Sequence, residues 1–243
     1  MLASVSAVRN PLRLARIAGT FYLGTILAGL FSELVRYRVV VSGNAPATAH
    51  NMLVLEGFYR WAFASDLFAG ACYLVVTLLL YLLLKPVSGG ISLLAAFFSI
   101  IGVAVGAIGA LANLAALSLV EGTGYLGAFD AAQLQATAYL FVKLHAQGNL
   151  TSLVFFGCYC LLIGWLVFES SFFPRAIGVL MALAGACYLI NSLANFVSPP
   201  IAARLFPLIL LPCLVGELAL TLWLLVAGIN VPRWEERANR PTA

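Results

Sequence analysis

The chain has 243 residues, of which 63% are hydrophobic and 9% are charged, and its formal net charge is +4. Soluble domains are roughly 45–50% apolar and about 25% charged, so the composition excludes an ordinary soluble domain and is typical of a membrane protein. The basic residues form no run of the kind that binds nucleic acid, and we expect no nucleic-acid partner. The length suffices for about six spans of about 20 residues, so we expect a single transmembrane domain over residues 1–243.

Apolar runs predict an all-α fold, a polytopic bundle of about six transmembrane helices. Basic residues precede the first run, but no cleavage site closes it, and we expect a retained helix rather than a signal peptide. Polar or Pro/Gly segments at 85–90 and 169–175 join neighbouring spans as hairpins. Two longer connections lie on the opposite side, with Pro46 in a first helical turn and a capping box from Asp130 to Gln133. These connections either lie at the interface or extend the following span. The expected spans are approximately 15–38, 61–84, 90–119, 149–168, 175–197 and 205–229.

Basic residues are distributed unequally between the two sides of the expected bundle. The side that holds both termini has eight, and the other side has five. Since cytoplasmic loops are enriched in Lys and Arg, we expect both termini in the cytoplasm. The eight are Arg9, Arg13, Arg16, Lys85, Arg175, Arg233, Arg237 and Arg240, and the five are Arg36, Arg38, Arg60, Lys143 and Arg204.

Two expected spans carry stripes of small residues on one helical face. Small residues allow the backbone of a neighbouring helix to approach closely, so we expect tight helix packing there; a hinge or a substrate groove is the alternative. The stripes are Ser99, Gly102, Gly106, Gly109 and Asn113 in the third span, and Gly178, Ala182 and Ala186 in the fifth.

Several short motifs occur along the chain in an order and spacing known from one family. They are Ala15-Arg16-Ile17-Ala18-Gly19 with Tyr22-Leu23, then Leu80 to Val87, Leu144-His145 with Gly148, Phe155-Phe156-Gly157, Phe173-Pro174-Arg175 with Gly178, and Gly216-Glu217. From Pro11 to Gly228 the chain resembles the bacterial multi-pass membrane family catalogued as domain of unknown function 4386 (DUF4386). The resemblance implies a protein of the bacterial cytoplasmic (inner) membrane, and it carries over no activity and no catalytic residue. Glu169 departs from the basic or neutral residue expected there, which affects only the charge of that loop.

Polar side chains inside the apolar spans all fall toward the non-cytoplasmic half of the expected bundle. Charged groups at the bilayer centre cost at least about 2.5–3.5 kcal/mol on insertion scales and are functional hypotheses by default. Pro207 and Pro212 should kink the sixth span before Glu217, the deepest carboxyl, which should be protonated or paired because burial disfavours the charged form. The candidate residues of a ligand or proton site are Glu33, Arg36, Asp66, Asn113, His145, Asn149, Asn195 and Glu217.

These candidates also have structural interpretations. Glu33 and Arg36, three residues apart on one helical face, would neutralise each other. Asp66 would serve the exposed amides near a helix start. The asparagines would link helices, and a lone histidine near a span boundary is more often structural than functional.

The sequence leaves three functions open. The one we favour is binding or translocation of a small lipophilic or cationic ligand, or of protons, in the outer polar pocket. The second is an intramembrane acid/base enzyme acting on a lipid or isoprenoid, with Glu217 or Asp66 as general acid and His145 as proton shuttle. The third is a structural or assembly subunit without chemistry. The expected partners are the lipid bilayer and, for the first function, a small lipophilic ligand; the oligomeric state is left open.

We expect no cofactor and no metal. The sequence has no CxxC pair and no His-rich ligand spacing, although three carboxylates and one histidine could still supply ligands. The cysteines all lie in apolar runs, where we expect small buried side chains. They are Cys72, Cys158, Cys160, Cys187 and Cys213.

Overall fold

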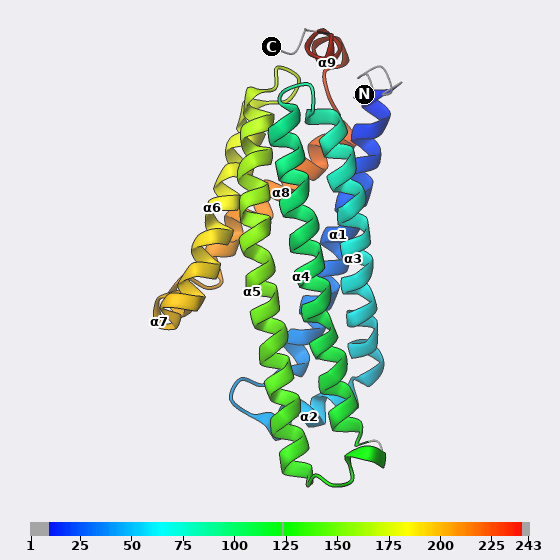
Figure 1. Cartoon of the computed structure of the whole chain (residues 1–243), viewed down its shortest axis with the longest axis vertical. Helices are drawn as coiled ribbons and strands as arrows, with labels where there is room; N and C mark the ends of the chain where they lie inside the picture. Colours follow the sequence, from blue (N-terminus) through cyan, green and yellow to red (C-terminus); the bar gives the residue numbers. More distant parts are fainter. Residues whose placement is uncertain (1–9, 123, 240–243) are drawn as a thin grey trace. The chain divides into compact units, whose positions relative to one another are not determined.

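The computed structural model describes residues 10–122 and 124–239. Within these ranges the chain forms helices joined by short turns and contains no strand, and six helical segments are long and apolar enough to cross a membrane (Figure 1). The expected all-α fold class is therefore confirmed. The six segments are α1 (Pro11–Val39), α3 (Glu56–Leu84), α4 (Gly89–Glu121), α5 (Ala131–Glu169), α6 (Arg175–Val197), and η3 (Leu208–Leu210) together with α8 (Leu211–Val226). The shorter elements are α2 (Ala45–Val54), η2 (Gly124–Leu126), α7 (Pro199–Leu205) and α9 (Val231–Ala238).

The two longer connections are helical, as their sequences indicate. Asn44 caps α2 by accepting a hydrogen bond from the Ala47 amide at 2.9 Å, and a proline occupies the first turn. The capping box is confirmed, because the Gln133 amide donates to Asp130 Oδ1 at 2.8 Å and the Asp130 amide donates to Gln133 Oε1 at 3.1 Å. This cap starts α5 at Ala131, so the expected span 149–168 is only the second half of a 39-residue helix.

The sixth candidate span, Leu208–Val226, lies within the expected range 205–229, but the kink expected before Glu217 is not found. Helix α7 ends at Leu205, Phe206 adopts an extended backbone, and helical geometry resumes through η3 into α8. Pro207 follows the break directly, and a proline supplies no amide hydrogen and disfavours the helical conformation of the residue before it. Pro207 therefore marks the break between α7 and the last span, and Pro212 lies in the first turn of α8, where a proline is compatible with the helix.

The chain divides into two compact units, which are described separately. Unit 1 comprises Met1–Leu23, Cys72–Gly102 and Ser152–Ala243, and unit 2 comprises Gly24–Ala71 and Val103–Thr151. Long helices contribute one end to each unit, so each unit is a bundle of half-helices. Unit 1 also holds α6, α7, α8 and α9, and unit 2 also holds α2.

Glycine contacts hold the helices of unit 1 together. A Cβ atom on Gly164 of α5 would lie 2.6 Å from the Ala182 amide nitrogen, and one on Gly178 of α6 would lie 2.6 Å from the Phe168 nitrogen. Farther along the same helix pair, a Cβ on Gly157 would lie 3.0 Å from the Gly185 carbonyl oxygen. These distances are shorter than van der Waals contact, so only glycine fits. The tight packing expected of the small-residue stripe in the fifth span is confirmed.

The core of unit 2 combines α2 with the half-helices around it. Val39 and Met52 are almost fully buried together with Leu117 of α4 and Ala138 of α5. Asn51 Nδ2 donates to the Val39 carbonyl oxygen at 3.2 Å, which ties α2 to the end of α1. The short helix therefore closes one end of unit 2.

We predict that Gly164→Val destabilises the protein by about 1–3 kcal/mol, because its side chain would overlap the α6 backbone. Gly29→Ala is the matched control: no atom lies within 4 Å of a Cβ atom added there, and replacing a helical glycine by alanine favours the helix. Thermal unfolding in detergent should show a lower Tm for the first variant and an unchanged or higher Tm for the second. Equal melting temperatures would contradict the glycine contact.

Candidate functional site

The centre of unit 2 is an arginine held between two carboxylates. Arg36 Nη1 of α1 donates to Asp66 Oδ2 of α3 at 2.7 Å, and Arg36 Nη2 donates to Asp66 Oδ1 at 3.4 Å. Nη2 also donates to Glu33 Oε1, one turn earlier on α1, at 2.9 Å. The side chains of Arg36 and Asp66 are 12% and 18% exposed, whereas that of Glu33 is 64% exposed. Asp66 is thus the inner carboxylate of this group, and Glu33 the outer one.

Hydroxyl groups fix α1 against α3 beside these charges. Ser32 Oγ donates to the Ala62 carbonyl oxygen at 2.9 Å, and Ser65 Oγ donates to the Ala28 carbonyl oxygen at 3.1 Å. Both alanines and Ser32 are buried, so the two backbones approach closely at this level. The guanidinium therefore meets the Asp66 carboxylate because two neighbouring helices are cross-linked one turn away.

Asp66 lies in the middle of its helix. α3 begins at Glu56, ten residues before Asp66, directly after the short helix α2 and Leu55. The interpretation that Asp66 serves the amides of a helix start is therefore wrong. Asp66 instead forms an ion pair with Arg36 of α1.

His145 is buried against a glycine contact between α4 and α5. A Cβ atom on Gly148 would lie 2.9 Å from Gly109 Cα, so the two backbones touch, which confirms the close approach expected of the stripe in the third span. This closeness lets His145 Nδ1 reach the Gly109 carbonyl oxygen at 3.1 Å, and Asn149 Nδ2 lies 3.1 Å from His145 Nε2. Because a carbonyl oxygen only accepts, Nδ1 carries the proton and Nε2 accepts from Asn149. The imidazole is neutral in this arrangement.

Asn113 forms a hydrogen bond with Tyr59 on another helix, a residue that the sequence did not indicate as a candidate. The hydroxyl of Tyr59 in α3 donates to Asn113 Oδ1 in α4 at 3.1 Å, and both side chains are buried. Tyr59 and His145 both lie within electrostatic range of Arg36 and Asp66. Tyr59 precedes Asp66 by seven residues and so shares its helical face, which is the signal that could have identified it.

A second arginine of unit 2 also lies between two carboxylates. Arg60 Nε donates to Glu56 Oε1 at 2.8 Å, and Arg60 Nη2 donates to Glu121 Oε1 at the end of α4. These side chains are more exposed than those of Arg36 and Asp66. Glu56 and Arg60 are four residues apart, a spacing that predicts an ion pair on a helix. The pairing of Arg60 with Glu121 is visible only in the three-dimensional structure.

The remaining two candidates belong to unit 1. Glu217 Oε1 of α8 accepts a hydrogen bond from the Tyr188 hydroxyl of α6 at 3.0 Å, so this carboxyl has a polar partner on a neighbouring helix. Asn195 Nδ2 donates to the Asn191 carbonyl oxygen of its own helix at 2.8 Å, so this bond makes no link between helices. Tyr22, Tyr73 and Tyr159 lie within electrostatic range of Glu217.

The six candidates in unit 2 form three hydrogen-bonded sets, which we call together the inner polar group. It consists of Glu33, Arg36, Asp66, Asn113, His145 and Asn149, together with Tyr59. With both carboxylates ionised, one guanidinium and a neutral imidazole, the group carries one excess negative charge. No set of three or more His, Cys, Asp and Glu side chains that could hold a metal ion occurs in the described part of the chain.

Comparison with known proteins places the chain in a family of unknown function. The model of a family described as domain of unknown function (DUF4386) matches residues 17–228. A protein of Archaeoglobus fulgidus, named only "Uncharacterized protein", is 26% identical over 155 residues, which are 63% of this chain and 75% of that protein. No solved structure matches the chain.

We predict that Arg36→Gln destabilises the protein by about 3–5 kcal/mol, because it leaves the largely buried Asp66 carboxylate without its partner. The double variant with Asp66→Asn should recover most of this loss, since it removes the unpaired charge as well. Arg38→Gln, an exposed position on the same helix, is the control. Chemical unfolding in mixed micelles measures all three, and additive losses in the double variant would contradict the pairing.

Proposed function

The chain belongs to the family described as domain of unknown function (DUF4386), and for this membrane protein we propose binding or translocation of a cation at the inner polar group. The observation that carries the proposal is the single guanidinium of Arg36 between Glu33 and Asp66. Two carboxylates exceed one guanidinium by one negative charge. In an apolar surrounding such a charge is costly, so it favours the arrival of a positive partner.

A proton is the cation that this geometry favours. The carboxylate oxygens of Asp66 already accept from Arg36, which leaves few oxygen ligands for a metal ion that prefers six or more. A proton needs only one oxygen. Glu33 offers its second oxygen on an exposed side chain, so a proton can arrive there without breaking the bonds of Arg36 to Asp66.

The acidic character of unit 2 supports the same function. Its sequence holds five acidic and four basic residues, whereas unit 1 holds four acidic and nine basic residues. Arg60 with Glu56 and Glu121 forms another group with one excess negative charge. Two such groups would raise the local concentration of cations.

A structural role is the second candidate, and it is supported by the hydrogen bonds that these side chains form with one another and with the backbone. Arg36 holds both carboxylates, and both ring nitrogens of His145 have partners. Such a network can set the register of helices without binding anything. The two roles differ in whether the carboxylates exchange protons.

We further propose that the protein resides in the cytoplasmic membrane with both termini in the cytoplasm. The basic excess of unit 1, which contains both ends of the chain, supports this orientation.

We predict proton flux through liposomes that contain the purified protein. With a proton gradient as driving force and potassium with valinomycin to balance charge, a pH-sensitive dye inside the vesicles should report faster flux than in empty vesicles. Asp66→Asn should reduce the flux at least about tenfold, because it removes the negative charge by which the two carboxylates exceed the guanidinium of Arg36. Glu169→Gln, an exposed carboxyl on the α5–α6 turn, should leave it unchanged.

Three results are distinguishable in this experiment. Flux that depends on Asp66 supports a proton site. Absence of flux, with an organic cation that copurifies with the wild type and is lost from Asp66→Asn, supports ligand binding instead. Absence of both, with only a lower Tm for the variant, favours the structural network and overturns the proposal.

We predict that an epitope inserted after Gly127, in the turn between α4 and α5, is labelled by antibody in intact spheroplasts. An epitope added after Ala243 should be labelled only after the membrane is permeabilised. These outcomes follow from the higher count of basic residues on the side of the termini. The reverse labelling pattern would show the opposite orientation.

A further inference from the structure

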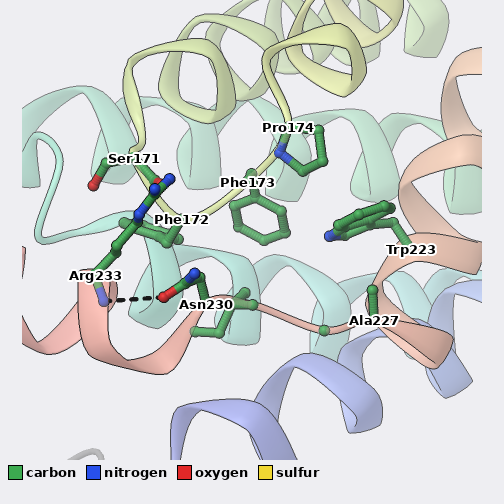
Figure 2. Close-up of a pocket in the computed structure, with 10 residues that line it drawn as sticks. Ser171, Phe172, Phe173, Pro174, Trp223, Ala227, Asn230 and Arg233 are labelled. Atoms are coloured by element: carbon green, nitrogen blue, oxygen red, sulfur yellow. Dashed lines mark hydrogen bonds between the residues drawn. The ribbon is translucent and has the colours of Figure 1, made fainter.

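A cavity of about 390 Å³ lies at one end of unit 1, far along the chain from the inner polar group. Figure 2 shows it between the α5–α6 turn and the segment that joins α8 to α9. Phe173 and Pro174 line it from the turn, Trp223 from α8, and Asn230 and Arg233 from the start of α9. Its volume is at the lower end of the range for small-molecule sites, which is enough for a headgroup but not for a whole lipid.

Hydrogen bonds between the two walls make this cavity a built feature. The Asn230 amide donates to the Phe172 carbonyl oxygen at 3.2 Å, and Arg233 Nη1 donates to the Ser171 carbonyl oxygen at 3.2 Å. The Asn230 side chain caps α9 by accepting from the Arg233 amide (dashed line in Figure 2). Trp234, the next residue of α9, is buried and donates to the Leu83 carbonyl oxygen at 2.9 Å. α9 is therefore anchored, and it holds Arg233 in place.

The lining combines one positive charge with aromatic rings. Arg233 is the charged residue among the lining side chains, and it is exposed. In Figure 2 Phe173 lies between Arg233 and Trp223, and Trp223 lies on the side away from Arg233. The N-cap residue of α6 is Pro174, which provides no side-chain cap, so the positive end of the α6 dipole adds to the charge of Arg233. This lining is amphipathic: cationic at one end and aromatic at the other.

The cavity lies where membrane spans end. One candidate span begins at Arg175, directly after Pro174, and another ends at Val226, three residues after Trp223. Tryptophan and arginine at such ends sit at the level of lipid headgroups. Leu222 and Val226, beside Trp223 on α8, are 52% and 77% exposed, which provides an apolar surface that continues from the aromatic end of the cavity.

We propose that this cavity binds an anionic phospholipid. Arg233 and the start of α6 receive the phosphate, Phe173 and Trp223 enclose the glycerol region, and the acyl chains lie on α8 over Leu222 and Val226. An anionic headgroup is matched by the positive lining and by the basic excess of unit 1. The site involves none of the residues of the inner polar group, so it goes beyond the proposed function.

The test is native mass spectrometry of the full chain released from micelles that contain phosphatidylglycerol or phosphatidylcholine. The wild type should retain phosphatidylglycerol in preference to phosphatidylcholine. Arg233→Gln should weaken phosphatidylglycerol binding about fivefold, the effect expected for one basic residue near a headgroup. Arg204→Gln removes an exposed arginine elsewhere in unit 1 and should leave the preference unchanged.

Ala227→Trp is a second variant, because it fills the lined space without changing charge. It should reduce phosphatidylglycerol binding as well, and it keeps the proposal falsifiable if Arg233→Gln does not fold. Equal retention of both lipids by the wild type would overturn the proposal. So would an equal loss in Arg204→Gln, unchanged binding in Ala227→Trp, or displacement of the lipid by millimolar inorganic phosphate, which would indicate a site for the free anion. None of these outcomes depends on proton flux.

Discussion

Backbone N–H and C=O groups inside a membrane need partners within the protein, and this constraint governs the contacts between helices here. Helices satisfy their own backbones, and the places where two of them touch are marked by glycines, such as Gly109 with Gly148 in unit 2 and Gly164 near Gly178 in unit 1. Side chains then donate to carbonyl oxygens of a neighbouring helix, as Ser32 does to Ala62. The polar groups of the site are held by the same close approach.

The charged side chains of unit 2 share one arrangement, an arginine paired with two carboxylates. Arg36 and Arg60 each bind two carboxylates, one on their own helix and one on another helix. The carboxylate on the other helix is Asp66 of α3 for Arg36, and Glu121 of α4 for Arg60. Each arrangement leaves one negative charge in excess within unit 2, whereas unit 1 is basic. The proposed cation site therefore lies in the acidic unit 2, and the proposed site for an anionic lipid lies in the basic unit 1.

The sequence located most of the candidate site but only part of its connections. Glu33 with Arg36 could be predicted because residues three apart share a helical face, and the pairing of Glu217 could be predicted because burial disfavours an isolated charge. The partners on other helices could not be predicted. Asn113 pairs with Tyr59, Arg60 with Glu121, and Glu217 with Tyr188. Depth along a helix follows from counting residues, but neighbours depend on the order in which helices pack.

The sequence by itself determined the all-α class, the six apolar segments, the proline in the first turn of α2, the capping box of α5 and the family, because each of these depends on composition and local spacing. The tertiary structure decided that Asp66 pairs with Arg36, that Asn195 bonds within its own helix, and that α7 and α8 are separate helices. It also decided that Arg233, remote in sequence from Phe173, lines the same cavity. These features depend on which faces meet, and in a chain this uniformly apolar, hydrophobic periodicity alone does not specify the faces.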